Sequence, residues 1–138
     1  MVTLSRAVEF STSLRYALAD LSDAENLARF GDRARQHGHN YRLELTVCGE
    51  VDPVTGMITD LKDIQAVLDR EVMDRFDHRD LNRDTPFFEK LVPSPENFVR
   101  VLRELLVDAL PPAVRLASLR LQPDADTWVD WIEPGQAP

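Results

Sequence analysis

The chain has 138 residues, of which 43% are hydrophobic and 29% charged, and its formal net charge is −8. This length predicts one domain, residues 1–138, with a core of its own. The acidic balance argues against nucleic acid as a partner, and the absence of an apolar run of spanning length argues against a membrane. A single cysteine, Cys48, excludes an internal disulfide, so we expect a cytoplasmic protein.

The first element is a strand over about Val2 to Tyr16, because apolar and polar residues alternate there. Residues 17–36 are acidic and irregular. We interpret them as a long loop with a helical turn around Asp23 to Phe30. Long loops inside a compact domain tend to be functional.

The second strand is the clearest element of the sequence. Residues from Tyr41 to Val47 alternate between apolar and polar, which is typical of a half-buried strand. His37 and His39 share the phase of Tyr41, so both imidazoles can face the same side. The segment DPVTG, residues 52–56, predicts a turn. We expect Met57 to Thr59 to return as a short strand.

Two helices and two strands follow. The first helix is expected from Leu61 to about Phe76, with Asp60 as its N-cap. The second begins after Ser94 and runs to about Leu110. Final strands are expected at about 114–122 and 126–133. The order predicts an α+β fold, in which an antiparallel four-stranded sheet carries two helices on one face. Closure between subunits would cover the sheet edges, so we expect a homo-oligomer.

Three segments occur together in a recognisable order and spacing, namely HGHNYRLELTVCGEVDPVTGMITDLKDI, FDHRDLN and PSPENF. In these segments the chain resembles the 6-pyruvoyltetrahydropterin synthase and 6-carboxytetrahydropterin synthase family over nearly its whole length. The resemblance implies the tunnelling fold (T-fold), in which subunits pool their sheets into an oligomeric β-barrel. A hexamer, or another assembly based on trimers, is implied, with active sites between subunits.

The resemblance also implies zinc, held by His37, His39 and a third histidine at the end of the first strand. That third position is Leu14, and leucine cannot coordinate a metal. A carboxylate of the long loop would complete a two-histidine, one-carboxylate set, the choices being Asp20, Asp23, Glu25 and Asp32. Alternatively, the two histidines only form hydrogen bonds. Zinc is left open, and no organic cofactor is expected.

Asp77 and His78 match the aspartate–histidine pair of the family, which implies catalysis. His78 would act as a general acid or base near neutral pH, with Asp77 as its partner. A histidine that follows a helix end is also explained by the helix dipole alone. The position of the family's thiol is Arg33, which cannot be a base at neutral pH.

The candidates for substrate binding are Arg33, Arg15 and Glu96. Arg33 can hold a carboxylate or phosphate with two hydrogen bonds, and Arg15 and Arg35 could join it in an anion pocket. Glu96 lies in the first turn of a helix, where the resemblance adds a binding role to capping. The family's pterin-anchoring glutamate would fall near Pro123 and is missing there, although Asp124 or Asp126 could lie nearby.

We therefore expect an enzyme of this family with an altered site. It would carry out lyase, dehydratase or cyclase chemistry by proton transfer on a small anionic or carbonyl-bearing molecule, in a secondary-metabolite pathway. Two alternatives stay open. One is an authentic zinc-dependent 6-carboxytetrahydropterin synthase acting on dihydroneopterin triphosphate, and the other is a non-catalytic pseudoenzyme.

Overall fold

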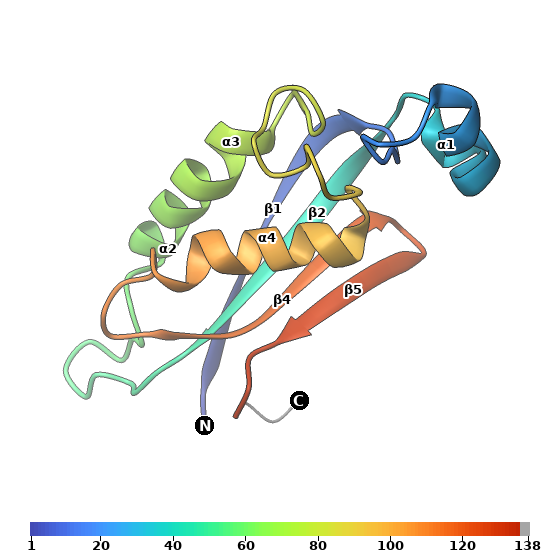
Figure 1. The fold of residues 1–138 in the computed structure, drawn as a ribbon. Coiled ribbons are helices and arrows are strands. Elements are labelled where there is room, and N and C mark those ends of the chain that lie inside the picture. Colours follow the sequence, from blue (N-terminus) through green and yellow to red (C-terminus); the bar gives the residue numbers. More distant parts are fainter. Residues whose placement is uncertain (136–138) are drawn as a thin grey trace.

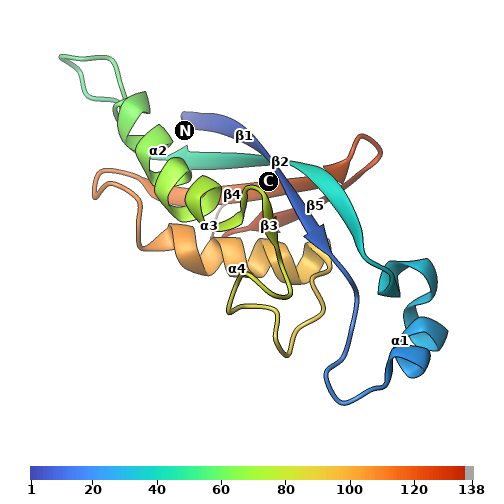
Figure 2. The same cartoon turned by 90° about the horizontal axis from the view of Figure 1, so that it is seen from above.

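A five-stranded sheet forms the centre of the computed structural model, which describes residues 1–135. The strand order is β3-β1-β2-β4-β5, and every neighbouring pair is antiparallel except β1 and β3. Helices α2, α3 and α4 cover one face of the sheet (Figures 1 and 2). The strands are β1 (Thr3–Leu14), β2 (His37–Cys48), β3 (Arg79–Asp80), β4 (Arg115–Asp124) and β5 (Thr127–Ile132).

The four long strands confirm the predicted sheet, and two details differ. The two-residue β3 adds a parallel fifth strand, which pairs with β1 at Thr12 and Ser13. The short strand expected at Met57–Thr59 is absent, so that prediction was wrong. Asp52 closes the preceding turn, since its backbone N–H donates to the carbonyl of Met57. The chain then passes directly into the N-cap of the next helix at Asp60.

The predicted helix from Leu61 to Phe76 is confirmed, but its middle turn is wider than an α-helix. It consists of α2 (Leu61–Leu68), a π-helical turn (Asp69–Met73) and α3 (Asp74–Phe76). Its buried residues Ile64, Leu68, Val72 and Phe76 are each four positions apart. In a regular α-helix such a stripe rotates by about 40° per step. The wider π turn slows this rotation and keeps the stripe on the sheet.

The second predicted helix is α4 (Pro95–Val107), which ends three residues before the expected Leu110. The Ser94 hydroxyl caps its first turn by accepting from Asn97 N–H at 3.2 Å. Phe98, Leu102 and Leu106 are fully buried against the sheet. The Phe98 ring centroid lies 5.3 Å from that of Tyr41 on β2, so the helix covers the end of the sheet where the histidines begin.

The helical turn expected in the long loop is confirmed as α1 (Asp23–Phe30), followed by a 3₁₀ turn (Gly31–Ala34). Ser22 and Glu25 form a reciprocal capping box at its start. This segment lies beyond the end of the sheet, away from the other helices (Figure 2). It therefore belongs to the connection between β1 and β2 and not to the layer that covers the core.

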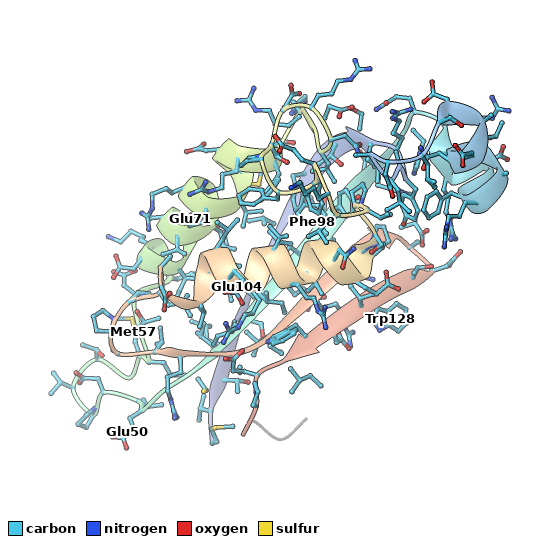
Figure 3. All side chains as sticks on the ribbon, viewed as in Figure 1. Glu50, Met57, Glu71, Phe98, Glu104 and Trp128 are labelled. Carbon is cyan, nitrogen blue, oxygen red and sulfur yellow. The ribbon has the colours of Figure 1, made fainter. Side chains whose placement is uncertain are left out.

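The face of the sheet opposite the helices is polar and uncovered. Arg120 and Asp130 form an ion pair across β4 and β5, with 2.8 Å between Nε and Oδ1. Trp128 lies on the outer strand and is 49% exposed (Figure 3). No helix within residues 1–135 is long and apolar enough to cross a membrane.

Candidate active site

Antiparallel pairing of β1 with β2 builds a row of side chains on the helix-covered face. Leu14 pairs with His37, and Thr12 pairs with His39. Paired residues project to the same side, so each imidazole stands beside one of these β1 side chains. The two imidazole centroids are 5.3 Å apart, with ring planes at 89°. The prediction that both histidines face one side is confirmed.

Both imidazoles are held in defined states. The Nδ1 atom of His37 lies 2.8 Å from the carbonyl oxygen of Arg35. A carbonyl only accepts, so this Nδ1 carries a proton and is the donor. Burial, and then the neighbouring His37, lower the pKa of His39, and Asp124 opposes them only in part. His39 is therefore a neutral imidazole at neutral pH.

The residues beside the two histidines do not fit a catalytic zinc site. Such a site needs three protein ligands. Within residues 1–135, no three histidine, cysteine, aspartate or glutamate side chains are grouped so that they could hold a metal ion. The third family position is filled by Leu14, which is 1% exposed and belongs to the core. Three of the loop carboxylates have other partners, since Asp23 contacts Arg15, Asp32 contacts Arg35, and Glu25 accepts from the Ser22 backbone N–H.

Asp77 and His78 are brought together by the backbone that follows α3. His78 has φ +60°, the left-handed conformation, and its Nδ1 lies 3.0 Å from Oδ1 of Asp77. The backbone of Ser11 on β1 holds both residues, because its N–H donates to the Asp77 carboxylate and its carbonyl accepts from His78 N–H. This hydrogen bond from Ser11, followed by the contact with His78, lowers the pKa of Asp77. The result is an ionised carboxylate beside an imidazole that is 84% exposed.

Arg33 faces the histidine row through Tyr16. The Tyr16 backbone N–H donates to the Arg33 carbonyl at 2.8 Å, and the Arg33 guanidinium lies 5.8 Å from the Tyr16 ring centroid. The Tyr16 ring is in turn 6.1 Å from that of His37. Arg33 is close enough to contribute to the lowered pKa of His39. It therefore stands at the mouth of the histidine row.

Tyr16 also connects this row to Glu96 on the first turn of α4. Burial raises the pKa of Tyr16, Arg33 opposes this, and the charge of Glu96 adds to it. From the sequence alone, Tyr16 is only the predicted end of a strand. The available signal for a role in the site was an aromatic residue at the predicted strand end, next to an arginine.

Arg15 does not join Arg33. Its guanidinium is 3.4 Å from the Asp23 carboxylate, and it lines a different cavity together with Arg35. The expected pocket of three arginines is therefore divided between two places in the structure.

A cavity of about 470 Å³ opens beside His39 where β2 and β4 lie next to each other. Its polar wall is formed by Asn40 and Arg42 of β2 and by Gln122 and Asp124 of β4. Such a wall offers amide, guanidinium and carboxylate groups to a small polar ligand. Sequence reasoning missed Asn40, Arg42 and Gln122, because polar residues on the outer phase of a strand look the same whether they face solvent or a ligand.

Comparison with known proteins identifies the family. A sequence profile described as 6-pyruvoyl tetrahydropterin synthase matches residues 3–133. The chain belongs to this family. It is 39% identical over 113 residues to human 6-pyruvoyl tetrahydrobiopterin synthase, a match that covers 80% of this chain and 78% of that protein. The resemblance deduced from the three sequence segments is confirmed.

Two further relatives place the chain within the 6-pyruvoyl tetrahydropterin synthase family. The structure of the Caenorhabditis elegans 6-pyruvoyl tetrahydropterin synthase superposes with a TM-score of 0.87 at 32% identity, covering 96% of this chain and 95% of that one. A putative 6-carboxy-5,6,7,8-tetrahydropterin synthase of Archaeoglobus fulgidus is 30% identical over 95 residues, covering 68% of this chain and 73% of that protein. The fold of this chain is thus the fold of the family.

Proposed function

We propose that this chain is a family enzyme with an altered site, which moves protons on a small molecule through His78 and Asp77. The substrate class is a small anionic or carbonyl-bearing compound, and the reaction is of the lyase, dehydratase or cyclase type. We further propose that it works in the cytoplasm as a homo-oligomer, hexameric or trimer-based, in a secondary-metabolite pathway.

The observation that carries the proposal is the geometry of the Asp77–His78 pair. The Asp77 carboxylate accepts from Nδ1 of His78 at 3.0 Å, which holds the ring in one orientation. The Nε2 atom of the exposed ring is then free to take a proton from a substrate carbon or hydroxyl and to return it. The left-handed backbone at His78 has a cost of about 1 kcal/mol or more in a non-glycine residue, and such strain is concentrated at functional sites.

The other residues of the site would bind and orient the substrate. Arg33 would hold an anionic or carbonyl group, and Glu96 would accept from a polar ring or hydroxyl. His37 and His39 would contribute their imidazoles as hydrogen-bonding groups. None of these roles requires a metal.

The test is turnover in D₂O, with dihydroneopterin triphosphate as the first substrate, because the family resemblance implies it. We expect wild-type protein purified without chelator to incorporate deuterium or release product, as followed by mass spectrometry. His78→Asn tolerates the left-handed backbone but lacks the imidazole, so kcat is expected to fall by about 100-fold or more. Arg100→Gln, an exposed change on α4, is the matched control. Undiminished deuterium incorporation in His78→Asn would reject the proposed role.

Metal content separates the alternatives that the sequence left open. If elemental analysis finds one zinc per chain, and that zinc is lost in His37→Ala/His39→Ala, the authentic zinc-dependent synthase replaces the present proposal. The pseudoenzyme reading instead predicts no turnover and no response of ligand binding to His78→Asn.

A further inference from the structure

Thr12 is a buried polar residue of β1 whose hydroxyl has no partner. Within residues 1–135 the buried polar residues are Thr12, Asn26 and Thr85. The Asn26 amide accepts from Leu18 N–H at 2.8 Å, and the Thr85 hydroxyl donates to the Leu81 carbonyl at 2.7 Å. Thr12 is 6% exposed, and among these described residues only its Oγ1 is a buried side-chain atom that lacks a hydrogen bond. Such an atom is costly to bury, so its presence calls for an explanation.

The nearby Tyr41 phenol does not satisfy Thr12. Burial raises the pKa of Tyr41 and the Thr12 hydroxyl opposes this rise, so the two hydroxyl groups are close. They do not form a hydrogen bond of normal length and angle, because Thr12 Oγ1 has no such partner within residues 1–135. Tyr41 is 1% exposed and its ring packs against those of Phe10 and Phe98. This packing prevents the phenol from turning toward Thr12.

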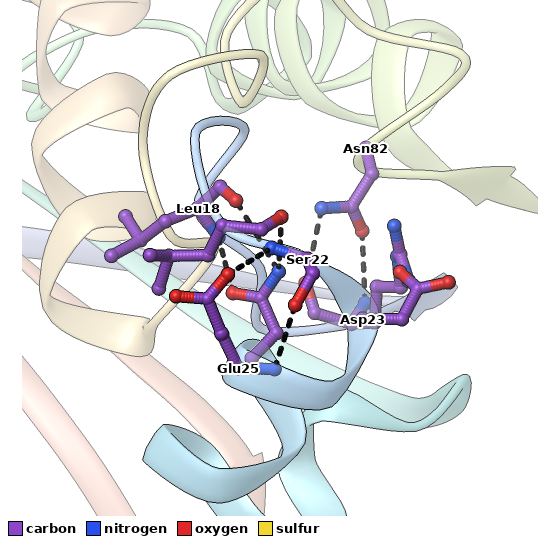
Figure 4. Close-up of polar contacts among 8 residues, drawn as sticks. Leu18, Ser22, Asp23, Glu25 and Asn82 are labelled. Atoms are coloured by element: carbon purple, nitrogen blue, oxygen red, sulfur yellow. Dashed lines mark hydrogen bonds and ion pairs between the residues drawn. The ribbon is translucent and has the colours of Figure 1, made fainter.

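The backbone around Thr12 is held at several points, so the strand cannot move to satisfy the hydroxyl. Thr12 pairs with His39 of β2 on one edge of β1 and with β3 on the other. A Cβ atom at Gly38 would lie 2.9 Å from the Thr12 carbonyl oxygen, so glycine is what allows β2 to approach this closely. At the end of β1, the Asn82 amide accepts from Arg15 N–H at 2.8 Å and donates to the Arg15 carbonyl at 3.0 Å (Figure 4).

The side chain beside Thr12 on β2 is the His39 imidazole, which offers an acceptor nitrogen. One ring N–H of His39 donates to the Pro123 carbonyl. Because the ring is neutral at neutral pH, its other nitrogen carries a lone pair. The pairing of β2 with β4 starts at Arg42 and Gln122, and the cavity of about 470 Å³ opens where the two strands separate, next to His39 and Pro123. A small molecule in this cavity can therefore reach the imidazole.

We propose that Thr12 is a substrate-binding residue, which together with His39 binds a hydroxyl group of the substrate. The lone pair of His39 needs a donor, and the Thr12 hydroxyl can both donate and accept. An alcohol meets both requirements, since its hydroxyl donates to His39 and accepts from Thr12 Oγ1. A carbonyl or a carboxylate has no proton to donate to His39. A small displacement of the partly buried His39 ring admits the alcohol to Thr12. The inference rests on the proposed function and narrows its substrate class at this point of the site.

The test is nuclear magnetic resonance of the whole protein with propan-2-ol and with acetone, which have the same heavy-atom skeleton but differ in the hydroxyl. We expect propan-2-ol to shift the Thr12 methyl and His39 ring resonances saturably, and acetone to leave them unchanged. In Thr12→Val, Kd for propan-2-ol should rise by about tenfold or more, whereas Thr12→Ser should stay within about threefold of wild type. Thr3→Val, at the exposed start of β1, is the matched control. Equal shifts with acetone, no shift with either compound, or equal weakening in Thr3→Val would overturn the proposal.

Urea unfolding separates a binding role of Thr12 from a structural one. Valine has the shape of threonine without the hydroxyl, so Thr12→Val removes an unpaired polar atom, and the urea midpoint should stay the same or rise. A hydroxyl bonded to Tyr41 in solution would instead give a lower midpoint in Thr12→Val, and that result would also overturn the proposal.

The result for Thr12 is independent of the result for His78. If His78→Asn keeps its deuterium incorporation, the proposed acid–base role fails, but the alcohol titration still decides the role of Thr12. If propan-2-ol does not bind and His78 proves to be catalytic, only the assignment of Thr12 fails.

Discussion

The backbone angle φ of a single residue, His78, determines whether the candidate acid–base pair can form. His78 lies beside its own neighbour Asp77 only because its φ is +60°. In an extended strand, adjacent side chains point to opposite sides and could not form this contact. The sequence predicted the pair from the family resemblance, but a non-glycine residue in the left-handed region has no reliable signature in one sequence.

The strain at His78 predicts a difference between two small replacements. We expect His78→Gly to be more stable than His78→Ala by about 1 kcal/mol, because glycine adopts a positive φ without a steric penalty. Urea unfolding of both variants measures this difference. Equal free energies of unfolding, or a less stable glycine variant, would show that the backbone at this position is not strained.

His39 predicts a dependence of stability on pH. Burial and His37 lower its pKa in the folded protein below the ordinary 6.5. The contribution of His39 to the free energy of unfolding is therefore fully present above the ordinary pKa. It is lost as pH falls through the lowered folded-state pKa, because the unfolded chain binds the proton more readily. We expect His39→Gln to flatten this part of the profile, measured by urea unfolding between pH 5 and 8. An unchanged slope would contradict the assigned burial effect.

At the scale of elements, β3 is an example of a strand held by side chains. It has only two residues, but the Asp80 carboxylate accepts from the Ser13 hydroxyl on β1 at 2.9 Å and from the backbone of Asn82 and Arg83. Partial burial opposes ionisation, and these hydrogen bonds together with that from Gln36 still lower the pKa of Asp80. The carboxylate therefore connects β1 and β3 with Gln36 and with the backbone of Arg83.

Asp80→Asn is expected to destabilise the fold by about 2 kcal/mol at neutral pH, because an amide cannot accept all of these bonds. Because the pKa of Asp80 is lowered, the extra stability of the wild-type protein is present above the ordinary carboxyl pKa of 3.8. It disappears as pH falls through the folded-state pKa of Asp80. Comparative urea unfolding at pH 7 and pH 3 tests both parts. A difference that persists unchanged at pH 3 would contradict the role of the charge.

The elements with strong local periodicity could be predicted from the sequence, and those set by tertiary contacts could not. The alternation of apolar and polar residues predicted β2, and Ser94 followed by Pro95 predicted the start of α4. The two-residue β3 and the π-helical turn have no periodic signal, because they depend on partners far away in the chain. In the candidate site, phase alone placed His37 and His39 on one side. The placement of Arg15 depends on a contact with Asn82 that no local pattern indicates.

At the scale of the whole molecule, the sheet has unpaired edges and an uncovered face. Among residues 1–135, the first residues of β1 have no strand partner on the β3 side, since β3 pairs only with Thr12 and Ser13. At the opposite edge, Trp128 and Ile132 of β5 are 49% and 45% exposed. Pairing of β5 with β1 of another copy would satisfy both edges and cover these apolar side chains.

This geometry predicts an oligomer that a change in β5 can dissociate. We expect Trp128→Glu/Ile132→Glu to shift the protein toward the monomer, because the change places charges on the edge that another copy would cover. Trp128→Phe keeps the apolar surface and should preserve the assembly. Light scattering coupled to size-exclusion chromatography gives the masses. Identical masses for wild-type protein and the double variant would place the subunit contact elsewhere.

The way the α1 segment joins the sheet also makes it a candidate position for engineering. The chain leaves β1 at Arg15, whose backbone N–H and carbonyl both form hydrogen bonds with the Asn82 amide. The two ends of the loop are joined by the hydrogen bond from Tyr16 N–H to the Arg33 carbonyl. Extra residues between Ala19 and Asp20, both exposed, would lengthen a loop whose ends are already fixed. Such lengthening costs only about 0.6 kcal/mol per doubling. A reporter peptide inserted there would extend from the end of the sheet without disturbing the pairing of β1 with β2.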